Sequence, residues 1–197
     1  MNLSKENLAK IGFSILGNFG YCWIAGGAIS SVLRGGRVDD IDIFFPNEDS
    51  RKNAVRKLVS MGGEKIHTHS FEERVRFKGK FYDFMHLGRN PEETISRFDY
   101  TVCCVVIDKK GNFYCHEDYF DHIGSKKLHF IGNYPNVNFK NKTKRLKKYI
   151  NKGYLIDHEN LDYWLQRLIK DHNKLRNKKK IQITEFNIVK NKIDQNK

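Results

Sequence analysis

Two aspartates, Asp40 and Asp42, alternate with isoleucines in the segment 40–45. Side chains alternate between the two faces of a strand, so this spacing predicts both carboxylates on one face and both isoleucines on the other. Two close carboxylates repel each other unless a cation lies between them, and Mg2+ binds carboxylates together with phosphate oxygens of a substrate. The pair therefore indicates a magnesium site, unless the segment is an edge strand that exposes its acids to water.

A glycine pair precedes the aspartates at a distance that leaves room for one short helix. Gly26 and Gly27 follow the apolar segment 21–25, which has the composition and length of a strand. Glycine permits a sharp turn, and the free N–H groups where the next helix begins suit a phosphate. A phosphate-binding turn beside a magnesium-binding pair is the equipment for phosphoryl or nucleotidyl transfer.

A third acid, Asp83, lies alone in the apolar and aromatic segment 81–87, which predicts a strand. An unpaired carboxylate in such surroundings is costly. A salt bridge to a nearby Lys or Arg is the simplest explanation for it, and the family resemblance described next offers another.

Two segments resemble the motifs of the nucleotidyltransferase superfamily. The first runs from Gly-Gly-Ala-Ile at 26–29 to Asp-Ile-Asp at 40–42, and the second, at 91–106, is similar to that family's Arg-Arg-Asp-Phe-Thr-Ile-Asn-Ala motif. More narrowly, they resemble the head domain shared by bacterial poly(A) polymerases and class II CCA-adding enzymes, over roughly residues 20–135. The resemblance implies an α+β fold, the polymerase-β-like nucleotidyltransferase head with a mixed sheet flanked by helices.

The resemblance also implies roles for individual residues. Asp40, Asp42 and Asp83 would be the catalytic carboxylates that hold two Mg2+ ions, one at the attacking hydroxyl and one at the leaving pyrophosphate. For Arg97 and Asp99 it implies contacts with the phosphate and ribose of the nucleotide, and a local ion pair that closes the helix is the alternative. The full set expected to bind the nucleoside triphosphate is Gly26, Gly27, Ser30, Ser31, Arg34, Arg97 and Asp99.

Several positions depart from the family pattern. Ser30 and Ser31 replace an Arg-Asp pair, although serine hydroxyls can donate to a phosphate oxygen and Arg34 can supply charge. Phe98 replaces the second arginine of the second motif, and Cys103 stands where the family has asparagine. The Glu-Asp-x-x-Arg motif that selects the base in CCA-adding enzymes is not recognisable. The sequence therefore predicts the chemistry more closely than it predicts the substrate.

Most of the positive charge lies near the C-terminus. The chain has 197 residues and a net charge of +13, and residues 140–197 hold 17 Lys and Arg against 6 Asp and Glu. Such a one-sided concentration is typical of a protein that binds a polyanion, here RNA, although a solvated tail would look the same. The residues expected to contact RNA are Lys144, Arg145, Lys147, Lys148, Lys178 and Lys179.

We expect a head domain at 1–135 followed by a basic helical region at 136–197. Periodicity predicts helices at 3–16, 49–61, 91–98, 140–151, 157–177 and 184–193, and a strand at 99–107. Ser4 is the expected N-cap of the first helix. The apolar stripe of the 157–177 helix is expected to pack on the head or on the preceding helix, and consists of Leu161, Trp164, Leu165, Leu168, Ile169 and Leu175. Neither a signal peptide nor a membrane span is evident and the four cysteines form no CxxC pair, so a reduced, cytoplasmic protein is expected.

The favoured function is a Mg2+-dependent nucleotidyltransferase that consumes an NTP, releases pyrophosphate and adds a nucleoside monophosphate to a hydroxyl. The expected acceptor is an RNA 3′ end, such as that of a tRNA, and both RNA maturation and a toxin- or defence-type modification stay open. The alternatives are a protein or small-molecule acceptor, and an inactive head kept as an RNA-binding module. The three acids argue against the inactive head. The nucleotide and the oligomeric state are left open.

Overall fold

The computed structural model describes residues 3–69, 72–132 and 139–178 of the chain. Its centre is a seven-stranded sheet with the order β3-β4-β5-β2-β1-β6-β7. The strands are β1 (Trp23–Ala25), β2 (Asp40–Phe44), β3 (Glu64–Thr68), β4 (Glu72–Phe77), β5 (Lys80–Met85), β6 (Val105–Asp108) and β7 (Phe113–Cys115). Strands β2 and β5 are parallel, and every other neighbouring pair is antiparallel. The predicted α+β fold with a mixed sheet is confirmed.

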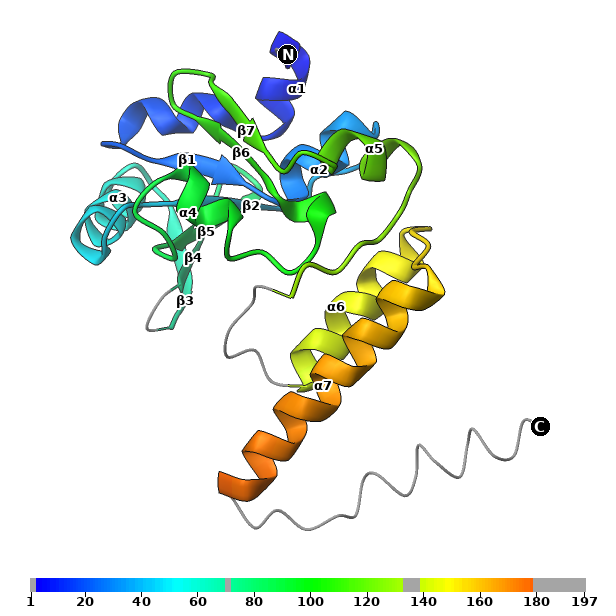
Figure 1. The fold of residues 1–197 in the computed structure, drawn as a ribbon. Helices are drawn as coiled ribbons and strands as arrows, with labels where there is room; N and C mark the ends of the chain where they lie inside the picture. The colour runs from blue at the N-terminus through cyan, green and yellow to red at the C-terminus, as the bar shows by residue number, and fades with distance from the viewer. Residues whose placement is uncertain (1–2, 70–71, 133–138, 179–197) are drawn as a thin grey trace.

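Helices cover both faces of the sheet (Figure 1). They are α1 (Lys5–Lys10), α2 (Gly27–Leu33), α3 (Glu48–Ser60), α4 (Pro91–Ile95), α5 (Tyr119–Gly124), α6 (Phe139–Asn151) and α7 (His158–Lys178). The main core includes side chains of α2, α3 and α5 together with Ile41 and Ile43 of β2. A smaller apolar cluster on the opposite face contains Trp23 and Phe44, with Ile95 of α4 packed against it. Strand alternation therefore turns the isoleucines of β2 into the main core and the aspartates to the other face.

The helix predicted at 3–16 is interrupted. Ser4 caps α1 as its spacing suggests, since its side chain accepts a hydrogen bond from the N–H of Asn7. The helix ends at Lys10, and a 3-10 helix, η1 (Phe13–Asn18), follows. Gly12 between them has a φ of 64°, and a Cβ atom there would lie 3.0 Å from the hydroxyl oxygen of Tyr82. The close approach of this turn to the sheet breaks the predicted helix.

The strand predicted at 99–107 is wrong in its first half. Thr101–Cys103 form a short 3-10 helix, η2, and β6 begins only at Val105. Its partner strand, β1, ends at Ala25, opposite Val106, because the chain turns at Gly26 into α2. Residues before Val105 therefore have no partner in β1. Cys104 instead bonds locally to the carbonyl of Thr101, and Tyr100 forms an isolated antiparallel bridge with Phe130.

Two long helices follow the head, as predicted for 140–151 and 157–177, and Figure 1 shows α7 extending away from the sheet. Leu146 and Tyr149 of α6 and Trp164 and Leu168 of α7 are buried in the main core, so these helices pack onto the head. Within the predicted apolar stripe, Leu161 also packs there, whereas Leu165 and Ile169 are 41% and 55% exposed, against expectation. The burial of Leu175 is not described.

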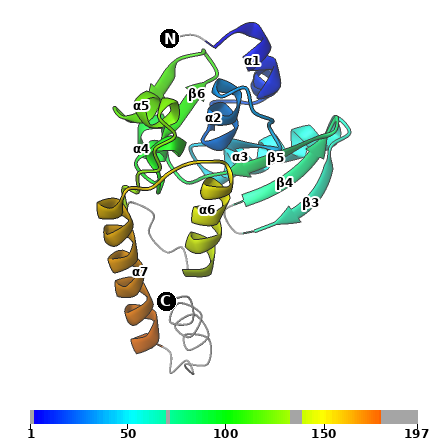
Figure 2. The same ribbon diagram turned by 90° about the vertical axis from the view of Figure 1, so that its right-hand side faces the viewer.

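The boundary predicted between residues 135 and 136, and the helix predicted at 184–193, lie outside the described residues. Within the residues that the structure describes, no helix is both long and apolar enough to cross a membrane. In Figure 2 the strands β3, β4 and β5 extend to one side of the molecule and β6 lies on the other. Strand β2, which carries the aspartates, lies between them in the sheet.

Candidate active site

The pairing of β2 with β5 brings the three predicted carboxylates together. The two strands run parallel, and Asp42 lies directly opposite Asp83, with Asp40 two residues earlier on β2. All three side chains belong to the same face of the sheet, since residues that are opposite across a strand pair or two apart along a strand point the same way. Neighbouring strands are only about 4.8 Å apart, so the carboxylates form one cluster.

An arginine that the sequence analysis did not identify enters this cluster from the next strand. Arg74 of β4 lies opposite Asp83 in the antiparallel register. Its Nε donates to Oδ1 of Asp83 at 2.6 Å, its Nη2 donates to Oδ2 of the same carboxylate, and Nη2 also lies 3.5 Å from Oδ2 of Asp40. The salt bridge considered from sequence is therefore present, and the hydrogen bond to Asp83 raises the pKa of Arg74. Only the register of β4 on β5 identifies Arg74 as this partner.

Asp42 is the carboxylate without a counter-ion. Within the described part of the chain no side chain forms a salt bridge or a hydrogen bond with it. Burial of the carboxyl group, and then the negative charges of Asp83 and Asp40, raise the pKa of Asp42 to about 7. Arg145 and Lys148 of α6 act in the opposite direction but do not cancel this effect. A partly buried carboxyl group beside a second carboxylate, with no cation of its own, fits a divalent metal ion with oxygen ligands.

The glycine turn lies against the carboxylates. Gly26 has a φ of 77°, which favours glycine, and a Cβ atom at this position would be 3.8 Å from Oδ2 of Asp42. The N–H of Gly26 donates to the carbonyl of Val105 at 2.9 Å and thereby anchors the turn to the sheet. The two features that the sequence placed one helix apart are therefore neighbours in space.

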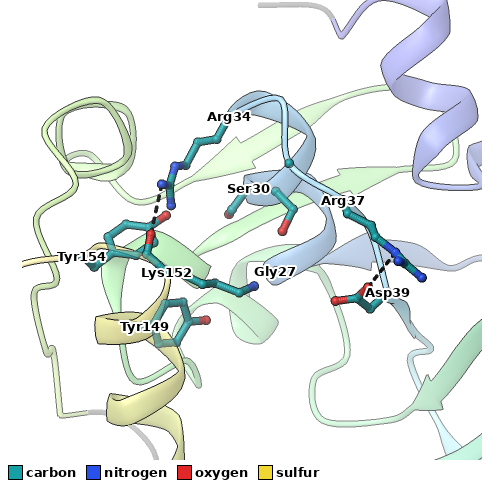
Figure 3. A pocket seen from close by; sticks show the side chains of 10 residues that line it. Gly27, Ser30, Arg34, Arg37, Asp39, Tyr149, Lys152 and Tyr154 are labelled. Atoms are coloured by element: carbon teal, nitrogen blue, oxygen red, sulfur yellow. Dashed lines mark hydrogen bonds and ion pairs between the residues drawn. The ribbon is translucent and has the colours of Figure 1, made fainter.

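A pocket of about 320 Å3 opens beside this turn, between α2 and the end of α6 (Figure 3). This volume is within the range of small-molecule sites. Figure 3 shows the side chain of Lys152 extending across the pocket toward Gly27. None of the three carboxylates lines the pocket, but two of its lining residues, Gly27 and Asp39, are the sequence neighbours of Gly26 and Asp40. Its lining consists of Gly27, Ser30, Ser31, Arg34, Gly36, Arg37, Asp39, Tyr149, Lys152 and Tyr154.

The residues expected to bind the triphosphate are not equally free to do so. The hydroxyl of Ser30 donates to the carbonyl of Val102 at 2.7 Å and lies 2.9 Å from the hydroxyl of Tyr119, so the fold itself uses it. Ser31 also lines the pocket and is the better placed serine. Arg34 stacks 4.5 Å from the centre of the Tyr154 ring and donates to the carbonyl of Lys152 at 3.4 Å, which joins α2 to the segment after α6.

Arg97 and Asp99 both form ion pairs, but only the pair of Arg97 is the local one considered from sequence. Nη2 of Arg97 lies 2.7 Å from Oε1 of Glu93, one turn earlier. The partner of Asp99 is not local, because Arg145 of α6 binds both of its carboxylate oxygens at 2.7 Å. Neither Arg97 nor Asp99 lines the pocket. The ion pair of Asp99, which is 2% exposed, instead ties α6 to the head.

Among the residues expected to contact RNA, one is used by the fold and others are exposed to solvent. Arg145 binds Asp99, whereas Lys144, Lys147 and Lys148 are exposed on α6. Lys178 ends α7, and Lys179 lies outside the described residues. Besides the Arg145–Asp99 pair, a second contact holds α6 to the head, since the hydroxyl of Tyr149 lies 2.6 Å from Sγ of Cys103.

Sequence reasoning missed the contribution of α6 and the segment after it to the pocket, namely Tyr149, Lys152 and Tyr154. The basic segment 140–152 indicated a charged helix, but nothing in its spacing indicated that its end lies over α2. That placement depends on long-range contacts such as the one between Arg145 and Asp99, which are 46 residues apart.

Solved structures with a similar fold include CCA-adding enzymes. A complex of the Thermotoga maritima CCA-adding enzyme with tRNA-CCA is 16% identical at a TM-score of 0.65, over 86% of this chain and 43% of that one. The Bacillus stearothermophilus CCA-adding enzyme in complex with CTP is 19% identical at a TM-score of 0.58, over 79% of this chain and 42% of that one. The chain spans less than half of either enzyme and shares the fold of their nucleotidyltransferase heads.

Sequence comparison gives the family. A protein of Bacillus phage SPbetaL7, "Gabija anti-defense 2", is 29% identical over 142 residues, which are 68% of this chain and 34% of that protein. The family model of the Gabija anti-defense 2 family protein matches residues 3–126, which include the glycine turn, all three carboxylates and the arginine between them. Because that match covers more than half of its length, the chain belongs to the Gabija anti-defense 2 family.

Proposed function

We propose that the chain is a divalent-metal-dependent nucleotidyltransferase that transfers a nucleoside monophosphate from an NTP to a hydroxyl of RNA. The observation that carries this proposal is the parallel pairing of β2 with β5, which places Asp42 opposite Asp83 beside the Gly26–Gly27 turn and its pocket. A carboxylate cluster without enough cations, next to a cationic pocket of nucleotide size, suits a triphosphate bound with a metal ion. The shared fold with CCA-adding enzymes supports the same chemistry.

In this proposal Asp40 and Asp42 hold the metal ion, since Asp42 has the greatest need of a cation. Bound Mg2+ would neutralise phosphate charge and activate the attacking hydroxyl. Ser31, Arg37 and Lys152 line the pocket and bind the triphosphate. The acceptor hydroxyl loses its proton to solvent and its oxygen attacks the α-phosphorus. A new P–O bond forms, and the bond between the α-phosphorus and the oxygen that bridges to the β-phosphate breaks, which releases pyrophosphate.

The acceptor is proposed to be RNA because exposed lysines lie on α6, the helix whose end closes the pocket. Lys144, Lys147 and Lys148 present three charges that can bind successive phosphates of a strand. One similar structure was solved with tRNA, which supports an RNA substrate here. Of the two biological roles left open by the sequence, the family and the phage relative favour a modification that counters a defence system over RNA maturation.

The test is an incubation of the purified protein with total RNA, Mg2+ and each radiolabelled NTP in turn. We expect label from one or two NTPs to enter RNA, and an Asp40→Asn/Asp42→Asn double variant to lose at least a thousandfold in rate. An Asp121→Asn variant is the matched control, because Asp121 is an exposed acid on α5, outside the carboxylate cluster. Label in protein would instead identify a protein acceptor.

One observation favours the second candidate, an RNA-binding module without activity. Arg74 already pairs with Asp83 and reaches Asp40, so the same geometry is also that of an ion-pair cluster with a purely structural role. Absence of transfer from every NTP to RNA and protein, together with tight and salt-sensitive RNA binding, would establish that candidate and refute the proposed enzyme.

A further inference from the structure

The Arg74–Asp83 pair gives the carboxylate cluster an unusual composition. When all three carboxylates are ionised, they and the one guanidinium have a net charge of −2, which a single divalent cation balances. Both oxygens of Asp83 accept hydrogen bonds from Arg74, and a guanidinium cannot lose its proton in a protein. A metal ion on Asp83 would therefore have a permanent positive charge beside it.

Arg74 is held firmly in this place. Arg74 and Asp83 are direct neighbours across the β4–β5 pair, so the backbone register itself brings their side chains together. The guanidinium carbon also lies 5.7 Å from the centre of the Phe81 ring. The side chain of Asp83 is 6% exposed, and removing the partner of a buried carboxylate is strongly unfavourable. These contacts oppose the displacement of Arg74 by a metal ion.

The guanidinium still has hydrogen-bonding capacity for a ligand. Nε and Nη2 make the bonds to Asp83 and Asp40, while Nη1 has no hydrogen-bond partner within the ranges that the structure describes. The side chain is 30% exposed, so it is accessible from solvent. A fixed guanidinium with free N–H groups is well suited to bind phosphate oxygens.

We propose that Arg74, oriented by Asp83, takes the place of one of the two metal ions, so that the site binds one divalent cation on Asp40 and Asp42. This inference rests on the proposed function, because it assigns Arg74 to the phosphates of the same nucleoside triphosphate. Asp83 is then a positioning residue for Arg74, and the two-ion site expected from the family resemblance is replaced by one ion and one guanidinium.

The experiment counts bound Mn2+ by electron paramagnetic resonance, with the full chain and no nucleotide. We expect one tightly bound Mn2+ per wild-type chain and none in the Asp40→Asn/Asp42→Asn variant. Arg74→Gln frees Asp83 and should raise the count to two, and Arg74→Gln/Asp83→Asn should return it to one. The matched control is Arg76→Gln, because Arg76 is on the same strand but pairs with exposed Glu64, and its count should stay at one.

A second variant covers the case in which Arg74→Gln does not fold. Arg74→Lys keeps the charge but loses the fork, so the Mn2+ count should stay at one while affinity for a non-hydrolysable ATP analogue falls roughly 10- to 100-fold. Two equally tight ions in the wild type, no ion at all, an unchanged count in folded Arg74→Gln, or unchanged nucleotide affinity in Arg74→Lys would each overturn the inference.

Failure of this inference can be told apart from failure of the proposed function by assaying the same preparations for nucleotidyl transfer. If the wild-type protein binds two ions and transfers label, the proposed function stands and the role given to Arg74 is refuted. If the wild-type protein binds one ion, the Arg74 variants change the ion count as expected and no label is transferred, the inference stands and the proposed activity is refuted.

Discussion

Replacing Asp42 by asparagine should stabilise the metal-free protein at alkaline pH. The pKa of Asp42 rises from its usual 3.8 to about 7 because burial and the charges of Asp83 and Asp40 disfavour the ionised form. Well below pH 3.8 the carboxyl group is neutral in both the folded and the unfolded chain, and it does not affect the free energy of unfolding. As the pH rises from 4 to 7 the unfolded chain loses this proton first, so the free energy of unfolding falls, and the full penalty is present above pH 7.

The size of the effect follows from the same values. A tenfold change in proton affinity corresponds to about 1.36 kcal/mol, so the rise to about 7 corresponds to ~4 kcal/mol at most. Asp42 is partly exposed, and solvent screening reduces this value. We expect Asp42→Asn, which has nearly the same shape but no charge, to raise the free energy of unfolding by about 2–4 kcal/mol at pH 8 and by only about 1 kcal/mol at pH 4.5.

The assay is urea unfolding followed by tryptophan fluorescence between pH 4.5 and 8.5 in EDTA, for the wild type, Asp42→Asn and the control Asp121→Asn. Adding Mg2+ at pH 8 should stabilise the wild type and leave Asp42→Asn nearly unchanged, because only the wild type retains both metal-binding carboxylates. If Asp42→Asn is no more stable than the wild type at pH 8, or if the difference does not vary with pH, the account of the cluster as an unbalanced buried charge is wrong.

Three further predictions concern the contacts around the pocket. Asp99→Asn should lower the free energy of unfolding by about 1–3 kcal/mol, which is less than for a fully buried pair because the side chain of its partner Arg145 is 36% exposed. The control Lys147→Met, on the same helix as Arg145, should change the free energy of unfolding by less than about 0.5 kcal/mol. Ser30→Ala should destabilise the chain by about 1–2 kcal/mol because Val102 and Tyr119 lose a buried partner, while Ser31→Ala should leave stability unchanged and weaken triphosphate binding in a fluorescence titration. Replacing Lys144, Lys147 and Lys148 together by glutamine should reduce the slope of log affinity for RNA against log salt by roughly 2, measured by fluorescence anisotropy.

Each of these has a clear opposing result. Equal losses from Asp99→Asn and Lys147→Met would show that the ion pair does not hold α6 to the head. A larger loss of stability from Ser31→Ala than from Ser30→Ala would reverse the roles given to the two serines. An unchanged salt slope in the triple lysine variant would move the RNA contacts away from α6.

The features predicted correctly from sequence are those that depend on near neighbours in the chain. Alternation along 40–45 placed Asp40 and Asp42 on one face because successive side chains of any strand point in opposite directions. The cap at Ser4 depends on contacts within one turn, and the helices at 140–151 and 157–177 depend on spacing within the segment. The α+β fold followed from two short motifs and their family resemblance.

The features that sequence reasoning missed depend on which segments meet. The helix at 3–16 breaks because Gly12 packs against Tyr82, 70 positions along the chain, and the strand at 99–107 is shortened because β1 ends. The stripe on α7 was predicted to be buried throughout, but an amphipathic pattern does not specify how wide the contact surface is, and Leu165 and Ile169 remain exposed.

The same division holds for the candidate site. The sequence by itself determined that a glycine turn and a pair of acids stand one helix apart, with a third acid that needs a partner, because strand alternation and the cost of a buried charge are local rules. Only the tertiary structure decided that Asp83 lies opposite Asp42, that Arg74 lies opposite Asp83, and that Asp99 belongs to Arg145. Register and helix docking result from packing between segments far apart in the chain, and the pattern of a single segment does not contain that information.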